Sequence, residues 1–536
     1  MKNFRFYALF FIFVILYSAL GANLYKLQIS KGAEFSAKAD VVKEIEKELT
    51  LRRGQIFFTD KFDTSIPIAL NKDEPIIFIA PNEIKSPKKT SEELSKIFGI
   101  DALKLEEVIN SNPESYFFPL VDRATEEQVN FVSEKKLEGV HVEQKQYRSY
   151  PYDNLASQVI GYVGKNDKNP EPTGIYGIER FYDKELSGGE DIHLTIDRNI
   201  QSHAEQLLNR YIEKFKATGG TMIVENPKTG KIIALTSKPD FNPNEYGKSN
   251  IKNFINPAVQ YQYEPGSVFK PLTMSAGIDT GAFTPNTTFV DKGFVTLNGR
   301  TIHNAENKVY GRITMTSVIE NSVNTGAVYA EQLIGHKNFY EYLKKFGFTE
   351  KTGINLPEEI AGNIRNLERK DARAIDFATV AFGQGAAVTP LQLVNAFSVL
   401  ANGGLLMKPY INEDEAPYVV RRVISDDTAK KVTSMIETTV EKAKIAAIPQ
   451  YRVAGKTGTA YIPENGKYTE EMIHTFVGFA PVSDPQFVVL VKLDRPQIGE
   501  LAGLTVVPAF RELSEFILNY YNIPPDKVSA AQNSSR

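Results

Sequence analysis

The first 25 residues contain an uncharged run that constrains the chain more than any other single feature. Residues 6–25 carry no charge and are dense in Phe, Ile, Leu and Val. A helix of about 20 residues, rising about 1.5 Å per residue, spans the hydrocarbon core of a bilayer. Lys2 and Arg5 precede the run, and positive flanks of this kind stay in the cytoplasm. We therefore expect residues 1–25 to form a cytoplasmic tail and a single membrane-spanning helix, with the rest of the chain outside the cytoplasm.

A cleaved signal peptide is the competing interpretation of the same residues. Ala19-Leu20-Gly21 would be a loose cleavage site. The run is long for the apolar region of a signal peptide, and Asn23–Gln28 continues as a helix-compatible stretch. These observations favour an uncleaved anchor, and the cleaved alternative stays open. No second run of this kind occurs in the printed sequence.

Composition excludes several kinds of chemistry. The formal net charge of the 536 residues is −3, without a basic excess that would indicate nucleic-acid binding. The chain has no cysteine, so disulfides, thiolate catalysis and Cys-ligated metals are excluded. Its 6 histidines include no pair four residues apart, so the H-E-x-x-H zinc motif is absent. We therefore expect no metal, no cofactor and no nucleic-acid partner.

Residues 26–185 are predicted to form a stalk followed by an irregular pedestal module. Residues 26–51 are charged and helical in pattern, which is typical of a stalk. Beyond them, short β-type runs such as Pro75–Ala80 occur beside polar amphipathic segments, and we expect a mainly β module. The linker Lys165–Thr173 is rich in Lys, Asn, Asp and Pro and predicts an exposed loop. Three helices are expected in the pedestal: Ser91–Phe98, Asp101–Asn110 and Thr125–Lys135.

Residues 190–523 are predicted to form a second module with an α+β pattern. Two strand-type runs are joined by a turn signal at 226–230, a helical block extends to about residue 404, and three strand-type runs and a helix follow. This order predicts an antiparallel five-stranded sheet flanked by helices. The tail 524–536 is rich in Ser, Ala and Gln and is expected to be disordered. The expected elements are the helices Thr195–Lys216 and Pro508–Tyr520 and the strands Thr221–Glu225, Lys231–Thr236, Arg452–Tyr461, His474–Ala480 and Gln486–Leu493.

Ser267 and Lys270 form an S-x-x-K motif, and Pro271 follows directly. A serine hydroxyl is a weak nucleophile at neutral pH and needs a base within hydrogen-bond reach. Residues i and i+3 share one face of a helix, so Lys270 can reach Ser267. Proline is tolerated in the first helical turn, so Pro271 predicts a helix start, where free N–H groups and the dipole favour negative charge. Alone the pair is weak, because a capping serine and a solvated lysine give the same pattern.

Two further motifs follow the S-x-x-K motif along the chain. Ser322-Val323-Asn324 lies between two segments expected to be helices, and alone it would be a polar turn. Lys456-Thr457-Gly458-Thr459 lies in a strand-like context, whereas the K-T-G triplets at 228–230 and 351–353 fall in a hairpin turn and a loop. A phosphate-binding loop ending here would need glycine at position 450, which is Gln450. Glycines at 455 and 458 remove side chains from this strand, so a substrate peptide could add beside it.

In this order the three motifs resemble the signature of penicillin-binding proteins and serine β-lactamases. Over nearly its whole length the chain resembles the class B penicillin-binding proteins, the membrane-anchored bacterial D,D-transpeptidases that cross-link peptidoglycan. The segment 383–393 and K-T-G in place of K-S-G favour the division-type, FtsI-like branch, and the elongation-type branch is the alternative. Phe62-Asp63 stands where the family pattern has Asn-Gly, which predicts a longer turn without glycine. The resemblance also rests on Arg53-Gly54-Gln55-Ile56, Arg148-Ser149-Tyr150-Pro151, Gly161-Tyr162-Val163-Gly164, Gly174-Ile175-Tyr176-Gly177-Ile178-Glu179, Leu194-Thr195-Ile196-Asp197, Gly383-Gln384-Gly385 and Phe476-Val477-Gly478-Phe479-Ala480-Pro481.

The resemblance implies catalytic roles for the motif residues. Ser267 would attack the carbonyl between the two terminal D-alanines of a stem peptide and expel D-alanine. Lys270 would be the base, and a nearby Lys456 would lower its pKa. Ser322 would relay a proton toward the leaving amine, and Asn324 would donate a hydrogen bond to the substrate amide.

The resemblance also implies where the substrate and the partners bind. Thr457 and Thr459, together with Lys456, would bind the terminal carboxylate on a strand that Gly458 leaves open. The N–H groups of Ser267 and Thr459 would form the oxyanion hole. The implied partners are stem peptides on lipid-linked or nascent glycan, β-lactams bound covalently, and a membrane glycan polymerase of the FtsW type, contacted through residues 6–25 and the pedestal.

Other function classes fit the sequence less well. A β-lactamase or D,D-carboxypeptidase would pass the acyl group to water, and Glu358 or Glu359 could stand in for its deacylating base. The E-x-x-L-N context of those hydrolases is missing. A β-lactam sensor would couple this fold to a zinc protease, for which no motif exists. A catalytically dead scaffold would not be expected to keep every catalytic side chain.

Overall fold

The structure is a computed structural model that describes residues 2–26, 29, 52–166, 169–464, 466–499 and 501–527. By their contacts the described residues divide into two compact units. The first contains residues 71–149 and 187–189 with the N-terminal segment up to residue 53, and the second contains residues 54–70, 150–186 and 190 onward. The stretch 26–185, predicted as one stalk and pedestal, is therefore shared between the units. The predicted stalk lies outside the described residues except for residues 26 and 29.

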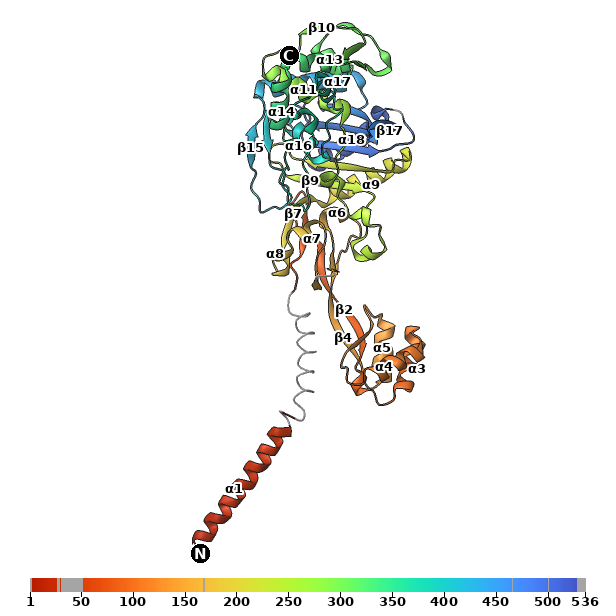
Figure 1. Cartoon of the computed structure of the whole chain (residues 1–536), viewed down its shortest axis with the longest axis vertical. Helices are drawn as coiled ribbons and strands as arrows, with labels where there is room; N and C mark the ends of the chain where they lie inside the picture. Colours follow the sequence, from red (N-terminus) through yellow and green to blue (C-terminus); the bar gives the residue numbers. More distant parts are fainter. Residues whose placement is uncertain are drawn as a thin grey trace, which may run out of the picture. The chain divides into compact units, whose positions relative to one another are not determined.

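Helix α1 spans Lys2–Tyr25 (Figure 1). Residues Tyr7–Tyr25 are long and apolar enough to cross a membrane, and within the described part of the chain no other helix meets both criteria. Their side chains are exposed, as expected of a helix whose apolar surface faces lipid. The predicted apolar helix is confirmed, and its length suits an anchor as well as a signal sequence.

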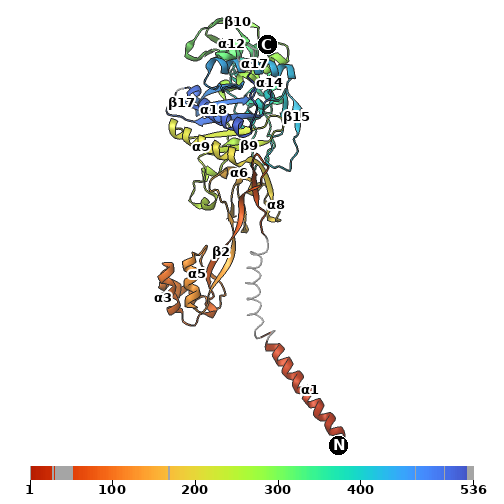
Figure 2. The ribbon, with the colours of Figure 1, turned by 180° about the vertical axis from the view of Figure 1, so that it is seen from behind.

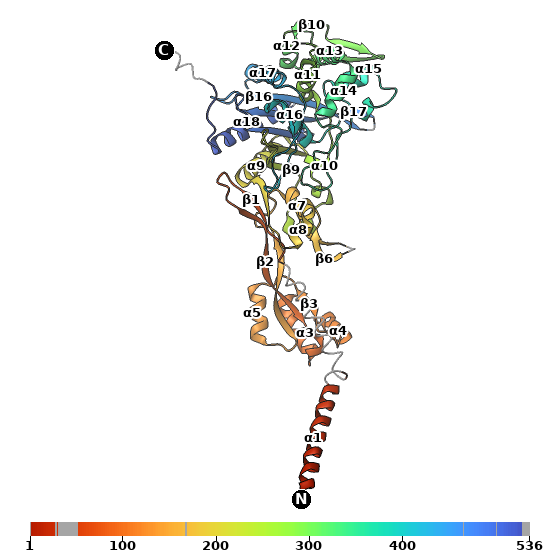
Figure 3. The ribbon, with the colours of Figure 1, turned by 90° about the vertical axis from the view of Figure 1, so that its left-hand side faces the viewer.

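The first unit contains a small mixed module in which three helices pack beside strands (Figure 3). Its core is formed by apolar side chains such as Ile77, Leu94, Leu105 and Val132. The three helices predicted for the pedestal are confirmed. Strand β2 pairs with β3 and β4. The elements are α3 (Pro87–Phe98), α4 (Ala102–Ser111), α5 (Glu126–Lys135), the 3-10 turn η2 (Pro81–Glu83), β3 (Phe118–Val121), β4 (Val140–Ser149) and residues 71–79 of β2 (Ile66–Ile79).

In the second unit, β1 (Ile56–Thr59) pairs antiparallel with the start of β2 and parallel with β7 (Ile192–Asp197). The turn between β1 and β2 contains the departure from the family pattern. Asp63 takes a left-handed φ of 57°, a conformation that asparagine and aspartate tolerate better than most residues. The Asp60 carboxylate accepts hydrogen bonds from the N–H groups of Phe62 at 2.8 Å and Thr64 at 3.0 Å. This side-chain bonding closes the turn without glycine.

Two sequence-based predictions in the second unit are wrong. The helix expected from Thr195 begins later, because Thr195–Asp197 complete β7 and Asp197 caps α9 (Arg198–Phe215) through its carboxylate. The β-branched Thr195 and Ile196 favour a strand, and pairing of His193 and Asp197 with β1 extends β7 through them. The expected loop 165–173 instead contributes to a hairpin of β5 (Val163–Asn166) and β6 (Asn169–Gly174).

A five-stranded sheet forms the centre of the second unit (Figure 1). Its order is β16-β17-β18-β8-β9, and every neighbouring pair is antiparallel. The prediction of an antiparallel five-stranded sheet from two early and three late strands is therefore confirmed. The strands are β8 (Gly219–Glu225), β9 (Ile232–Lys238), β16 (Ala454–Glu464), β17 (Lys467–Ala480) and β18 (Phe487–Asp494).

Helices cover both faces of this sheet. Helices α9 and α18 (Ala502–Tyr520) pack together against one face (Figure 2), and α16 (Pro390–Ala401) packs against β8, β17 and β18 on the other. The prediction that α18 starts at Pro508 is wrong, because the helix begins at Ala502 and contains the proline. Burial of Val506 and Phe510 against the sheet offsets the hydrogen bond that Pro508 cannot donate.

The segment between β9 and β16 is mainly helical and carries most of the predicted site. Three short two-stranded pairs, β10 with β13, β11 with β12 and β14 with β15, were not foreseen. The helices are α10 (Pro257–Gln260), α11 (Lys270–Asp279), α12 (Met315–Glu320), α13 (Asn324–Ile334), α14 (His336–Lys345), α15 (Ala374–Val380) and α17 (Asp426–Ala443). The strands are β10 (Thr288–Asp291), β11 (Phe294–Leu297), β12 (Arg300–His303), β13 (Gly311–Thr314), β14 (Leu405–Met407) and β15 (Val419–Arg422).

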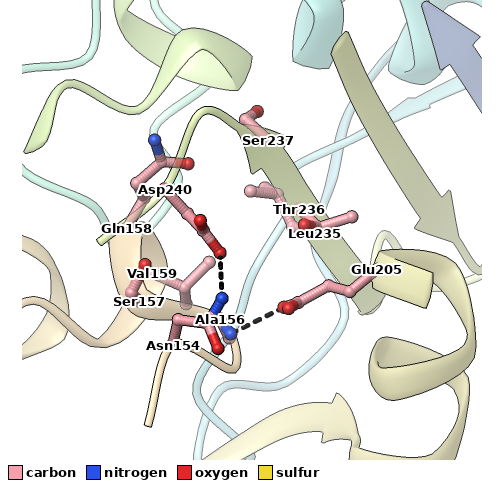
Figure 4. A pocket seen from close by; sticks show the side chains of 10 residues that line it. All are labelled: Asn154, Ala156, Ser157, Gln158, Val159, Glu205, Leu235, Thr236, Ser237 and Asp240. Atoms are coloured by element: carbon pink, nitrogen blue, oxygen red, sulfur yellow. Dashed lines mark hydrogen bonds between the residues drawn. The ribbon is translucent and has the colours of Figure 1, made fainter. Parts of the chain in front are cut away.

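A polar cluster fastens the segment before α6 (Ser157–Ile160) to α9 and β9 around a cavity of about 10 Å³ (Figure 4). The Ala156 N–H donates to Glu205 Oε1 at 2.7 Å, and Asn154 Nδ2 donates to Asp240 Oδ2 at 2.7 Å. A space of this size holds about one water molecule. The cluster therefore ties this segment to the sheet and offers no room for a substrate.

The C-terminal segment makes contacts beyond the predicted end of the module at residue 523. The Asp526 carboxylate accepts hydrogen bonds from the N–H groups of Arg452 at 2.6 Å and Ser483 at 3.1 Å. The Lys527 N–H donates to the Gln450 carbonyl. Residues 528–536 of the expected disordered tail lie outside the described residues.

Candidate active site

Ser267 lies in the one-turn 3-10 helix η5 (Gly266–Phe269), which leads directly into α11. Pro271 is in the first turn of α11, where its missing N–H breaks no intrahelical bond. The Lys270 N–H donates to the Ser267 carbonyl, so the two residues belong to one continuous turn. Ser267 is partly exposed, whereas Lys270 is fully buried. Ser267 is therefore accessible from solvent, whereas Lys270 is enclosed by the protein.

The Lys270 ammonium contacts the second motif. Its Nζ donates to the Ser322 carbonyl, to Ser322 Oγ at 3.1 Å and to Asn324 Oδ1 at 2.8 Å. Ser322 has a left-handed φ of 55°, which is uncommon for a residue other than glycine. Asn324 begins α13, and its Nδ2 donates to the His303 carbonyl at 2.9 Å. That bond fixes which end of the amide faces Lys270.

Lys456 on β16 reaches the same serine. Its Nζ donates to Ser322 Oγ at 3.2 Å and to the Thr457 carbonyl at 3.2 Å. Lys456 is 1% exposed, so its charge is desolvated. The Ser322 hydroxyl therefore lies between two buried lysines that come from α11 and β16.

Burial and mutual repulsion shift the titration of the two lysines. Burial lowers the pKa of Lys270 well below its usual value, and the charge of Lys456 lowers that pKa further. Burial lowers the pKa of Lys456 to about 8. The site thus contains one amine that loses its proton readily and a second cation that helps it to do so.

Glycine at position 458 lets β16 approach the nucleophile turn. A Cβ on Gly458 would lie 2.4 Å from the Pro265 carbonyl oxygen and 2.6 Å from a methyl group of Val268. Thr457 and Thr459, on either side, are partly exposed. Only a residue without a side chain allows this approach, and the strand then runs directly beside Ser267.

The Gly383-Gln384-Gly385 segment supports the nucleophile turn from another direction. The Gly266 N–H donates to the Gly383 carbonyl at 3.0 Å. Gly383 has a φ of 81°, and a Cβ there would lie 2.1 Å from the Gly266 carbonyl oxygen. Sequence reasoning noted this motif only as a resemblance. The structure shows that it packs directly against the turn that carries Ser267.

Four of the predicted site residues, from three separate segments, are joined by hydrogen bonds, whereas among the described residues no side-chain hydrogen bond links Ser267 to Lys270. Ser322 links Lys270 to Lys456, Asn324 bonds to Lys270, and the 456–459 strand packs on the Ser267 turn. Sequence reasoning missed the His303 carbonyl, because a backbone acceptor has no side-chain signature. The other two K-T-G triplets lie apart in a turn and a loop, as predicted.

Glu358 and Glu359, the conceivable deacylating bases, are engaged elsewhere. Glu359 accepts hydrogen bonds from the Thr352 N–H at 2.7 Å and from the Gly353 N–H at 3.0 Å. Glu358 forms an ion pair with Arg180 at 2.6 Å. Across the residues that the structure describes, no group of three or more His, Cys, Asp or Glu side chains could hold a metal ion.

The comparisons with known proteins agree with this architecture. The family model described as "Penicillin binding protein transpeptidase domain" matches residues 220–515, and "Penicillin-binding Protein dimerisation domain" matches residues 50–210. An α+β transpeptidase module preceded by a dimerisation module defines the class B penicillin-binding proteins. The chain belongs to the penicillin-binding transpeptidase family, and the sequence-based recognition of that family is confirmed.

Curated relatives match over most of the chain. Stage V sporulation protein D of Bacillus subtilis is 30% identical, with 86% of this chain and 78% of that protein covered. The probable peptidoglycan D,D-transpeptidase PbpC of Pseudomonas aeruginosa is 30% identical, with 98% and 97% covered. FtsI of Escherichia coli is 26% identical, with 91% and 87% covered. A peptidoglycan synthetase structure from Bifidobacterium adolescentis has a TM-score of 0.69 at 24% identity, covers 90% of this chain and 97% of that chain, and supports the fold.

Proposed function

We propose that this chain is a peptidoglycan D,D-transpeptidase that cross-links stem peptides through an acyl-enzyme on Ser267. The observation that carries the proposal is the convergence of Lys270 and Lys456 on Ser322, beside a partly exposed serine at the start of a helix. Ser267 Oγ attacks the carbonyl of the penultimate D-alanine, and Lys270 accepts the hydroxyl proton. The peptide C–N bond breaks, and D-alanine leaves after its amine takes up a proton through Ser322.

The second half of the reaction transfers the acyl group to an amine. The amino group of a neighbouring stem peptide attacks the Ser267 ester and forms a new C–N bond, the ester C–O bond breaks, and a proton lost by the amine restores the serine hydroxyl. The donor peptide lies along β16, with its terminal carboxylate near Lys456 and the Thr457 and Thr459 hydroxyls. The N–H groups of Ser267 and Thr459 stabilise the tetrahedral oxyanion, and loss of one such donor typically costs about 2.7–4 kcal/mol.

Mass spectrometry after exposure to penicillin tests the site assignment. Intact-mass and peptide mapping should find one penicilloyl adduct on Ser267, and Ser267→Ala should carry none. An adduct on a different serine would overturn the assignment. The adduct should also persist, because Glu358 and Glu359 are bonded to other residues and are not free to activate water. Turnover of many adducts per second would instead support a β-lactamase.

The division-type role is part of the proposal. Relatives named FtsI and Stage V sporulation protein D support it. Another relative, PbpC, is named only as a probable transpeptidase. In the natural host, depletion should produce filaments with blocked septa. Rounded cells would favour the elongation-type alternative. The proposed partner is a membrane glycan polymerase of the FtsW type, which should co-purify with the full chain and be lost when α1 is replaced by an unrelated membrane helix.

The membrane topology rests on α1. We propose that α1 remains as a single-pass anchor and that the catalytic unit lies outside the cytoplasm. N-terminal sequencing of the protein from membranes should begin at or beside Met1, whereas a start near Ala22 or Asn23 would show a cleaved signal peptide. Deleting residues 1–25 should release a soluble protein that still acylates, because the second unit has its own core.

A further inference from the structure

Asp291, at the end of β10, is a buried carboxylate that the proposed mechanism does not use. It is 2% exposed. Its Oδ1 accepts hydrogen bonds from the Gly293 N–H at 2.9 Å and from Thr325 Oγ1 at 2.6 Å. Its Oδ2 accepts from Asn304 Nδ2 at 2.9 Å and from the Tyr310 N–H at 2.8 Å. All four partners donate, so the carboxylate is held entirely by hydrogen bonds.

Two of these partners directly follow residues of the active site. Thr325 follows Asn324 in the first turn of α13, and Asn304 follows His303 at the end of β12. They also bond to each other, because Asn304 Oδ1 accepts from the Thr325 N–H at 3.1 Å. Asp291 therefore fixes the start of α13 relative to the end of β12.

The distance between those two segments decides how Asn324 is oriented. A side-chain amide donates at its nitrogen and accepts at its oxygen. Asn324 Nδ2 donates to the His303 carbonyl at 2.9 Å, which leaves Oδ1 directed at Lys270 Nζ, 2.8 Å away. If the His303 carbonyl moved away, the amide could rotate and Lys270 would lose an acceptor.

We propose that Asp291 is a positioning residue for the acylation step. By tying Asn304 and Thr325 together, it holds the His303 carbonyl against the Asn324 amide and keeps Asn324 Oδ1 on the Lys270 ammonium. This inference rests on the proposed function, because it assumes that Lys270 is the base for Ser267. Asp291 touches neither substrate nor base, and it acts only through the two segments that it joins.

A carboxylate suits this position better than an amide of the same shape. Asparagine at 291 would turn an NH2 group toward two of the four donors, and buried donors without acceptors are costly. Burial by itself raises the pKa of Asp291, but the hydrogen bonds, first that from Thr325, outweigh burial and hold the pKa of that carboxyl below its usual range. The group therefore remains an acceptor over the working pH range.

Loosening Asn324 should change the pH dependence of acylation as well as its rate. A hydrogen bond to the charged form of an amine raises its pKa, so loss of the Asn324 acceptor lowers the pKa of Lys270 further. The acid limb of the acylation rate should then move to lower pH. The plateau rate should fall about tenfold or more, since small misplacements in an active site cost up to about 10²-fold. Lys456, the other charged group that faces Ser322, is unchanged by the variant.

The test compares Asp291→Asn with Asp279→Asn in the full-length protein in detergent. Asp279 ends α11 and is a matched control, because its carboxylate accepts from the Ser425 N–H at 2.8 Å, Thr428 Oγ1 at 2.9 Å and the Tyr342 hydroxyl at 2.6 Å. Acylation by a fluorescent penicillin is followed by stopped flow from pH 5 to 9, with the thermal midpoint measured in parallel. We expect both variants to lower the midpoint, but only Asp291→Asn to lower the plateau and shift the acid limb.

Thr325 supplies a second pair of variants in case Asp291→Asn does not fold. Thr325→Ser keeps the hydroxyl that donates to Asp291, and Thr325→Val removes it with little change of shape. Thr325→Val should show the same lowered plateau and shifted acid limb as Asp291→Asn. Thr325→Ser should keep the pH profile of the unmodified protein. A profile like that of the control in both Asp291→Asn and Thr325→Val would overturn the inference. Ser267→Ala distinguishes failure of this inference from failure of the proposed function. Labelling that survives in Ser267→Ala would contradict the proposed function itself.

Discussion

Lys270 and Lys456 direct their amine nitrogens at one oxygen, the Ser322 hydroxyl, from 3.1 and 3.2 Å. Both lysines are buried, so water does little to screen one charge from the other. Two ammonium groups so close together favour loss of a proton from one of them. Lys270 loses its proton more readily, because its own burial and the charge of Lys456 both lower its pKa.

Removing the charge at position 456 should move the pH profile of acylation. The active form of Lys270 is the neutral amine, so the rate rises as pH increases through its pKa. Lys456→Met removes the repulsion, raises the pKa of Lys270 and should shift the acid limb to higher pH. Stopped-flow acylation with a fluorescent penicillin measures the shift. Lys492→Met is the matched control, because Lys492 is equally buried in the same sheet but pairs with Asp494. An unshifted limb in Lys456→Met would contradict the electrostatic coupling.

The two lysines should also differ when each is replaced singly. Lys270→Ala removes the proton acceptor, and general-base catalysis typically contributes roughly 10²–10⁴-fold, so acylation should be nearly abolished. Lys456→Arg keeps a positive charge but not the compact ammonium. It should retain measurable acylation and depend less on the carboxylate of the ligand. Equal losses in the two variants, or a larger loss in Lys456→Arg, would argue against this division of roles.

Much of the catalytic architecture could be predicted because its signals are local. The strands of the central sheet appeared as short apolar runs between turn residues, and Pro271 marked the start of the helix after Ser267. Four side chains of the three motifs are joined by hydrogen bonds in the structure: Lys270 of α11, Ser322 and Asn324 at the start of α13, and Lys456 of β16.

The remaining features depend on long-range packing, which a single sequence does not display. Thr195 is in β7 because residues on either side of it, His193 and Asp197, pair with β1, more than 130 residues earlier, and its own N–H donates to the Ile411 carbonyl at 2.9 Å. Helix α18 continues through Pro508 because its neighbours are buried against the sheet. The roles of the His303 carbonyl and of the Asp291 hydrogen bonds depend on how the loops fold. Backbone acceptors and buried aspartates have no distinctive sequence pattern that would predict them.

Substitution of Gly458 should impair acylation more than stability. In Gly458→Ala the new methyl group would lie 2.4 Å from the Pro265 carbonyl, so β16 or the Ser267 turn must move. A displacement of this kind typically costs up to about 10²-fold in rate. Gly247→Ala is the control, because a Cβ there has no neighbour within 4 Å. Acylation rates and thermal midpoints of both variants should be measured together. A wild-type acylation rate in Gly458→Ala would show that the strand is not held as closely as the structure indicates.

Glu225 should make the stability of the second unit depend on pH. It is a buried glutamate on β8 whose two carboxyl oxygens have no hydrogen-bond partner among the described residues, and burial raises its pKa to about 8. An unfolded chain loses this proton near pH 4.5, whereas the folded protein keeps it up to about pH 8. The contribution of Glu225 to the free energy of unfolding is therefore largest below pH 4.5. It falls as the pH rises from 4.5 to 8. The expected loss between pH 5 and pH 8 is about 3 kcal/mol.

The variant Glu225→Gln removes this linkage while keeping the size and the neutral state of the side chain. Thermal unfolding of the full chain in detergent should show a small effect at pH 5 and a clear stabilisation of the variant at pH 8. Curves of midpoint against pH that run parallel for Glu225→Gln and the unmodified protein would show that Glu225 is not protonated in the folded state.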